Sequence, residues 1–474
     1  AVEYEHAASS GRVLRGLIGL GPSAMAQALP ASGVQARLEL PRLDAEAWGA
    51  ALQRVFGGGS ALSAGAGLLP TQWTLHADEL VLDGRSLQQV SASGTQQAGS
   101  WRGEVQAREL AGRIEYHEGA DGRAGKVSAR LARLSIPAGG SDDRTLLAQP
   151  PSHIPALDVV VDQFELRGKR LGRLEIQAVN RDVASSSSGT VLQDWELSRL
   201  ALQAPEADFI AQGRWAALAR GPGLPLDPRG SRAPEDRRRT QLDFKLDIRD
   251  AGKLLARLDM PDVLLRGRGE LHGSLGWRGT PFSPHYPSMA GQLHLDVGAG
   301  QFLKAEPGVA KLLGVLSLQA LPRRLTLDFR DLFSTGFAFD FIRGDVEVQA
   351  GIARTNNLQM KGPSAAVLMD GEADIDHETQ RLRVLVVPEI DAGTAALVAT
   401  AINPAIGIGA FVAQLVLKRP LIKAATREFQ ISGRWDDPQV TPVGAPAAGA
   451  PAPTEPAAPS APRSSADTAQ EERS

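Results

Sequence analysis

The sequence predicts a mainly β protein, an elongated body built from repeated strands with a few short helices. Three observations support this fold class: one-sided alternation of apolar residues, an internal repeat, and an ample supply of turn formers. The 474 residues include 50 Gly and 31 Pro, enough to separate many short strands by turns. Hydrophobic residues make up 43% of the chain but aromatic residues only 5%, so apolar surface must come mainly from aliphatic side chains.

Alternation is clearest in residues 241–249. Strand side chains point to opposite faces with a period of two, so this segment should form a strand with one apolar and one wet face. The apolar face carries Leu242, Phe244, Leu246 and Ile248. The pattern recurs at Leu174, Ile176 and Ala178, at Leu293, Leu295 and Val297, at Leu325, Leu327 and Phe329, and at Val346 and Val348.

An aromatic stripe extends the same pattern. Phe337, Phe339 and Phe341 are separated by single residues, so they are expected on one face of a strand. Two interpretations of this stripe remain open. It packs beneath a preceding helix, or it forms a floor that contacts lipid.

An internal repeat connects distant parts of the chain. Residues 77–87 resemble residues 161–171. Each copy is followed by a strand, a polar turn and a Trp, at Trp101 and Trp195. Repeats of this size indicate stacked hairpins, each burying its apolar face against its neighbours.

Two short segments have helical spacing instead. Residues 44–56 place Trp48 on an apolar stripe, and Asp44 is the expected N-cap. Residues 306–318 carry a stripe of Val and Leu, with Pro307 in the first turn.

A third segment, residues 392–417, contains no charged residue. Its length suits a membrane span, but Asn403-Pro404 interrupts it, so we expect a hairpin of two short helices, 394–402 and 405–417. A cover over the β body, a membrane-contacting hairpin and a true span all remain open. The candidates for membrane contact are Leu397, Val398, Ile402, Ile406, Ile408, Phe411, Val412 and Leu415.

Composition and motifs argue against an enzyme, and we expect no cofactor and no metal. The net charge of −3 gives no reason to expect nucleic acid, and the absence of Cys excludes disulfides and thiolate metal sites. Phosphate-binding loops, nucleophile elbows and zinc-protease motifs are missing, and the eight His are scattered. Asp370, Glu372, Asp374 and Asp376 alternate along one strand face, where a solvated surface is favoured over a calcium site.

Several segments in the second half resemble the AsmA-like family. The matching stretches are 300–314, 325–332, 336–340, 358–365, 387–389 and 431–438. The resemblance is good over 290–440 and looser over 30–290. One departure is Phe429 where the family has Tyr. Another is the family's amino-terminal inner-membrane helix, which this sequence lacks, so the chain is expected to be part of a longer protein.

The resemblance implies a long, curled antiparallel sheet with an apolar groove in the periplasm of a Gram-negative bacterium, anchored to the inner membrane by a segment outside this chain. Phospholipids would move along the groove between inner and outer membranes, without catalysis. The implied partners are phospholipid acyl chains, both membranes, and an outer-membrane or periplasmic protein. Alternatives are an assembly factor for outer-membrane proteins and a passive envelope scaffold.

This resemblance also suggests a division into three parts. Residues 1–290 form a repeat-built β region, residues 291–440 form the AsmA-like carboxy-terminal region with the helical hairpin at 392–427, and residues 441–474 form a disordered Ala/Pro-rich tail. The groove candidates are Leu242, Phe244, Leu246, Ile248, Leu325, Leu327, Phe329, Phe337, Phe339 and Phe341.

The uncharged segment leads to a first prediction. The double substitution Leu397→Asp and Val412→Asp should weaken association with liposomes, because each change places a charge on an apolar helix face. Liposome flotation measures the effect. Unchanged flotation would mean that the segment covers the β body instead.

Overall fold

The computed structural model describes most of the β body. The described residues are 2–6, 13–22, 28–48, 50, 70–82, 85–97, 99–119, 124–137, 154–184, 191–217, 238–281, 284–303, 337–363, 365–388, 407–409 and 426–443. The helix expected at 306–318 and the groove candidates Leu325, Leu327 and Phe329 lie outside this set. So do most of the hairpin expected at 392–427 and nearly all of the tail expected from residue 441.

The described strands form one 22-stranded sheet. Its first half contains β1 (Val2–His6), β2 (Val13–Leu20), β3 (Gly33–Asp44), β4 (Gln72–Leu82), β5 (Arg85–Gln97), β6 (Ser100–Gln106), β7 (Leu110–His117), β8 (Lys126–Ile136), β9 (Ala156–Leu166), β10 (Lys169–Ala184), β11 (Val191–Gln203) and β12 (Ala207–Ala217). Its second half contains β13 (Arg238–Ile248), β14 (Leu264–Arg266), β15 (Gly269–Arg278), β16 (Ala290–Phe302), β17 (Phe337–Gln349), β18 (Ile352–Lys361), β19 (Ala365–Asp374), β20 (Thr379–Pro388), β21 (Arg427–Arg434) and β22 (Asp437–Val443). Helix α3 (Ala251–Arg257) and the 3₁₀ turn η4 (Tyr286–Ser288) interrupt the second half.

Each strand lies beside its neighbour in the sequence, with one exception. The short β14 pairs with β16, and β15 takes the place beside β13. The mainly β, repeat-built fold class is therefore confirmed. Most pairs are antiparallel as expected, but β2–β3, β3–β4 and β8–β9 are parallel. Alternation places side chains on a face but carries no information about strand direction, so the sequence pattern could not distinguish these pairs.

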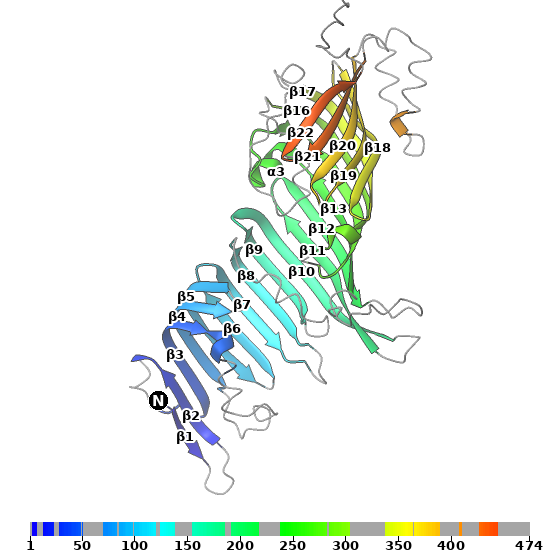
Figure 1. Cartoon of the computed structure of the whole chain (residues 1–474). Helices are drawn as coiled ribbons and strands as arrows, with labels where there is room; N and C mark the ends of the chain where they lie inside the picture. Colours follow the sequence, from blue (N-terminus) through cyan, green and yellow to red (C-terminus); the bar gives the residue numbers. More distant parts are fainter. Residues whose placement is uncertain are drawn as a thin grey trace, which may run out of the picture.

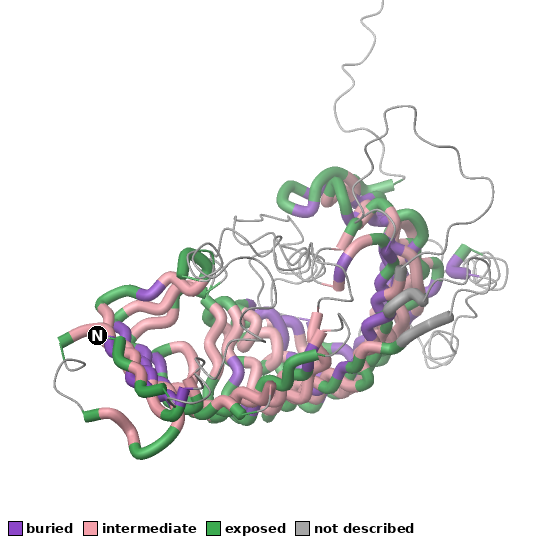
Figure 2. The backbone as a smooth tube through the Cα atoms, turned by 90° about the horizontal axis from the view of Figure 1, so that it is seen from below, coloured by how far each residue is buried: buried purple, intermediate pink, exposed green. Residues whose placement is uncertain are grey.

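The sheet is long and curled (Figure 1). It runs from β1 at the lower left to β22 at the upper right, with the strands lying across its long axis. Seen from below, the chain follows an arc that bends upward toward the carboxy-terminal strands (Figure 2). Among the described strands, β1 pairs only with β2 and β22 only with β21, so both ends of the sheet are open.

Helical structure begins where the sequence predicted after β3. Residues 45–48 are helical, and Asp44 Oδ1 accepts a hydrogen bond from the Ala47 N–H at 2.9 Å, as an N-cap does. Trp48 keeps 41% of its surface exposed. Residues 51–56 of the expected helix lie outside the described residues.

Trp residues form a cross-strand row near one rim of the sheet. Trp195 pairs with Trp215, Trp215 with Thr240, and Thr240 with Trp277. All four side chains are at most 7% exposed. This row includes Trp195, one of the two repeated Trp, and α3 lies at the opposite rim.

Large side chains in the middle of the sheet should dominate its stability. Leu174 is 4% exposed at the centre of β10, so Leu174→Ala should cost about 2–5 kcal/mol by removing buried contacts and leaving a cavity. Thermal or urea denaturation followed by circular dichroism measures the loss. The matched control is Leu82→Ala, because Leu82 is 49% exposed and its truncation should change stability by less than about 0.5 kcal/mol. Equal effects of the two changes would contradict this picture of the core.

Candidate functional site

The strand register aligns apolar residues into a continuous row across fourteen strands, β2 to β13 plus β15 and β16. We call this row 1, and each member is the register partner of the next. Its members are Leu20, Leu38, Leu75, Ala92, Val105, Gly112, Leu131, Val161, Leu174, Leu202, Phe209, Leu246, Leu271 and Leu295. No charged or polar side chain interrupts it.

A second row lies two residues away along each strand, on the same face. Its members, called row 2, are Ile18, Ala36, Trp73, Gly94, Gly103, Ile114, Ala129, Val159, Ile176, Leu200, Ala211, Phe244, Gly273, Leu293 and Val346. With neighbouring strands about 4.8 Å apart, the two rows form an apolar strip roughly 60 Å long.

The opposite face of the same strands is largely polar. One of its rows contains Arg37, Thr74, Ser93, Glu104, Arg113, Arg130, Val160, Glu175, Ala201, Ile210, Lys245, His272, His294 and Asp345. Ion pairs cross it, such as Lys245 with Glu270 at 2.9 Å. The sheet thus separates an apolar face from a charged face along most of its length.

Part of the apolar strip remains partly exposed. From Leu202 to Leu295, every member of row 1 is half-buried, whereas Leu131, Val161 and Leu174 farther back are buried. Phe209 and Phe244 stack with ring centroids 6.0 Å apart. This stretch therefore offers apolar surface that is incompletely covered by the described protein.

The structure brings most described groove candidates to this face. Leu246 belongs to row 1 and Phe244 to row 2, with Leu242 and Ile248 on the same side of β13. Phe337 and Phe339 lie in an adjoining apolar cluster, where they are 7% and 2% exposed.

Phe341 departs from the expected stripe. Its neighbour Ile342 packs against the apolar cluster, and the Arg343 guanidinium lies 4.0 Å from the centroid of the Phe341 ring. Adjacent strand residues point to opposite faces, so Phe341 faces away from the cluster. On the paired strand β16, Val297 and Phe302 both belong to the same cluster although they are five residues apart. Residues an odd number apart normally point to opposite faces of a strand, so the side chains switch faces between these two positions.

Of the membrane-contact candidates, only Ile408 is described. It is fully buried against Leu368 and Leu385. The strand neighbours of these two Leu, Val367 and Val386, belong to the apolar cluster, so Ile408 packs on the opposite face of the sheet. Leu397, Val398, Ile402, Ile406, Phe411, Val412 and Leu415 lie outside the described residues.

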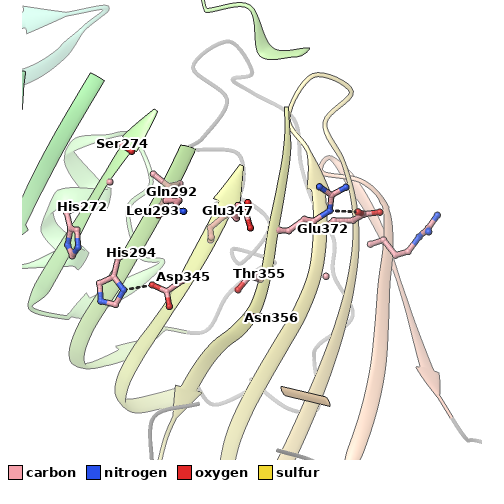
Figure 3. Close-up of a pocket in the computed structure, with 15 residues that line it drawn as sticks. His272, Ser274, Gln292, Leu293, His294, Asp345, Glu347, Thr355, Asn356 and Glu372 are labelled. Atoms are coloured by element: carbon pink, nitrogen blue, oxygen red, sulfur yellow. Dashed lines mark hydrogen bonds and ion pairs between the residues drawn. The ribbon is translucent and has the colours of Figure 1, made fainter. Parts of the chain in front are cut away.

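A cavity of about 1090 Å³ lies on the polar face between β15 and β20 (Figure 3). The His272 and His294 rings are 4.9 Å apart, and His294 Nδ1 lies 2.7 Å from Asp345 Oδ1. The buried Asn357 donates from Nδ2 to Asp345 Oδ2 at 2.7 Å. Burial raises the pKa of Asp345, but the hydrogen bonds from His294 and Asn357 outweigh it and bring that pKa below its usual value.

Charged side chains at this cavity and on the strands beside it lie in pairs. Arg354 Nε lies 3.3 Å from Glu372, Arg383 Nε donates to Asp370 at 3.0 Å, and Asp374 lies 2.9 Å from His377. Three of the four alternating carboxylates therefore have separate partners, and Asp376 lies in the turn after β19. Within the described ranges, no three His, Asp or Glu side chains are arranged to hold a metal ion.

The alternation of apolar residues in the sequence does not reveal the small residues that belong to both rows. Ala92 and Gly112 in row 1 and Gly94 and Gly103 in row 2 carry little apolar signal of their own. The Trp73 indole lies across the last two, so a Cβ at Gly94 would come within 2.5 Å of its ring. Only the register shows that these positions complete the strip.

Comparisons with known proteins found a matching family model and a related bacterial protein. The family model described as YhdP protein matches residues 1–440. The Intermembrane phospholipid transporter YhdP of Escherichia coli (strain K12) is 35% identical over 170 residues, which are 36% of this chain and 13% of that protein. This chain therefore spans only a small part of that relative's length. No solved structure matches, and no described helix is long and apolar enough to cross a membrane.

The depressed pKa of Asp345 predicts a pH-dependent contribution to stability. An ionised Asp345 stabilises the fold above the unfolded-state pKa of about 3.9, and that contribution is lost as the pH falls through the lower folded-state pKa. Thermal denaturation should therefore give the wild type a higher Tm than Asp345→Asn near pH 6, and the difference should disappear in strong acid. The control Gln292→Ala should show no such trend. A pH-independent difference for Asp345→Asn would contradict the ionic network.

Proposed function

This chain belongs to the YhdP protein family, and we propose that its two apolar rows carry phospholipid acyl chains between the inner and outer membranes. The observation that carries the proposal is the uninterrupted apolar strip across fourteen strands. The relative's name, an intermembrane phospholipid transporter, supports the same substrate. In this proposal the chain lies in the periplasm, anchored to the inner membrane by a segment outside it.

The physics of the strip suits transport without bond breaking. Each CH₂ group of an acyl chain that leaves water for an apolar surface gains roughly 0.8 kcal/mol. Successive positions along the rows offer chemically similar side chains, so a chain that moves from one strand to the next exchanges like contacts for like. Movement along the strip then needs no catalytic group.

The length of the strip also fits this role. At roughly 60 Å, the rows are about twice the thickness of a bilayer's hydrocarbon core. Several lipids can therefore occupy the strip at once. In a longer family member, this strip would form one section of a continuous path.

Two prolines at the β22 edge of the sheet argue against an assembly factor that captures unfolded strands at this edge. Pro438 and Pro442 share one side of β22, and they lack the N–H that strand addition requires. The pairing of β22 with β21 is continuous, so the backbone nitrogens of these two prolines must face the free edge and not β21. A passive scaffold is disfavoured by the half-buried stretch from Leu202 to Leu295, which a closed core would cover.

Membrane contact by the uncharged segment 392–417 remains a proposal for the candidates other than Ile408, which lie outside the described residues. Ile408 itself packs on the sheet. Ile408 therefore lies on the face opposite the rows that would hold acyl chains.

Neighbouring residues of β12 provide a matched test. Phe209 belongs to row 1, whereas Ile210 is 43% exposed on the opposite face. Phe209→Glu puts a charge in the proposed acyl path and should reduce bound phospholipid several-fold, measured by mass spectrometry of purified protein and by transfer between vesicles. Ile210→Glu makes the same chemical change on the other face and should leave both readouts unaltered.

Circular dichroism must show that both variants fold. Equal lipid binding by the two variants would place the acyl chains elsewhere. Wild-type protein that carries no phospholipid and takes none from vesicles would overturn the proposed function itself.

A further inference from the structure

Helix α3 separates the apolar cluster from a group of cations at one rim. Asp250 caps the helix by accepting the Lys253 N–H at 3.0 Å. Ala251, Leu254 and Leu255 pack into the apolar cluster. The next residues around the helix, Lys253 and Arg257, point to a cavity instead. Helix α3 therefore lies at the boundary between the apolar cluster and this cavity.

The cavity has a volume of about 400 Å³ and lies between α3 and the β9–β10 and β11–β12 turns. Its walls contain four cationic side chains and one carboxylate. The lining residues are Gly168, Lys169, Arg170, Glu206, Lys253, Ala256 and Arg257. This excess of positive charge favours an anionic ligand.

Some of these charges hold the walls in place. Arg257 donates to Glu206 from Nε at 2.7 Å and from Nη2 at 2.8 Å, and to the Arg170 carbonyl from Nη1 at 2.6 Å. The hydrogen bond from Arg257 lowers the pKa of Glu206, which stays ionised as the partner of this cation. Lys169 Nζ donates to the Leu258 carbonyl at 2.7 Å and lies 3.2 Å from Asp259.

Two cations remain for a ligand. The Arg170 guanidinium makes no hydrogen bond or ion pair with the residues that the structure describes, and the Lys253 side chain is 74% exposed, with Asp250 at 3.4 Å. An Arg fork matches two phosphate oxygens, and a Lys adds a mobile point charge. At Gly168 a Cβ would meet nothing within 4 Å, so the turn leaves this side of the cavity open.

The cavity lies within one lipid length of row 1. Leu166 and Leu171 flank the β9–β10 turn and pack in the same cluster as Leu174 of row 1. Four residues of strand separate Arg170 from Leu174, about 13 Å. An acyl chain spans about 15 Å, half the hydrocarbon core of a bilayer, so from a headgroup held at Arg170 it reaches the half-buried Leu202, the register partner of Leu174 in row 1.

We propose that this cavity binds the phosphate headgroup of a phospholipid whose acyl chains lie on row 1. The inference rests on the proposed function and adds a headgroup site to it. The recognised chemistry is a phosphate ester. Free phosphate shares that chemistry, so the test must separate the two sources.

The test compares two lipids with identical acyl chains, phosphatidylethanolamine and diacylglycerol. The double variant Arg170→Gln and Lys253→Gln should bind phosphatidylethanolamine roughly tenfold to a hundredfold more weakly, because it loses charge-assisted hydrogen bonds to phosphate. Diacylglycerol has no phosphate, so its binding should not change. Lipid bound per protein after incubation with vesicles is measured by mass spectrometry.

A matched control removes two cations outside the cavity, Arg173→Gln and Lys245→Gln, whose partners are surface carboxylates. This variant should bind both lipids as the wild type does. Arg170→Lys with Lys253 intact should restore part of the phosphatidylethanolamine binding, since it keeps the charge but not the fork.

Each outcome separates this inference from the proposed function. Undiminished phosphatidylethanolamine binding by the double variant would overturn the headgroup site while leaving the apolar rows in place. Wild-type protein that binds neither lipid would overturn the proposed function. Calorimetric binding of inorganic phosphate that depends on Arg170, without preference for the lipid, would assign the cavity to free phosphate and overturn the lipid assignment.

Discussion

Cross-strand register is the constraint on which the rest of this structure depends. An apolar side chain on one strand helps to form a continuous surface only if its register partners are also apolar. Row 1 and row 2 satisfy that condition across fourteen strands, including the parallel pairs β2–β3 and β8–β9. A shift of one residue in a pair would bring side chains of the largely polar opposite face into the strip.

Burial divides the strip into two sections with different consequences. Around Val161, which is 0% exposed, the side chains are covered and contribute mainly to stability. From Leu202 onward the same row is half-buried, and here the surface is available to a ligand. One continuous pattern therefore supports both the core and the proposed acyl path, and the chain needs no separate binding domain.

The sequence predicted the parts of this fold that depend on local alternation. The stripe from Leu242 to Ile248 lies on the apolar face of β13, and Asp44 caps a helical turn, as expected. Family membership over residues 1–440 agrees with the resemblance found in the motifs. These features are encoded by neighbouring residues, so a single sequence suffices to find them.

Features that depend on long-range pairing could not be predicted in this way. Helix α3 has only seven residues, too few for a periodic signal, and its cap at Asp250 lies in an ordinary polar stretch. The cavity beside it combines side chains from α3 and from two turns that are far apart in sequence. The face change between Val297 and Phe302, which turns Phe341 away from its stripe, likewise arises from the pairing of two strands.

The contacts of α3 also have a mechanical consequence. A sheet one layer thick bends most readily about an axis parallel to its strands, where only hydrogen bonds between neighbours resist. Arg257 ties the β9–β10 turn to the β11–β12 turn through the Arg170 carbonyl and Glu206, and Lys169 joins the first turn to the end of α3. The helix thus connects five neighbouring strands, β9 to β13, along one rim. These contacts should make this rim stiffer than the segments on either side, so bending of the long sheet is expected mainly in those segments.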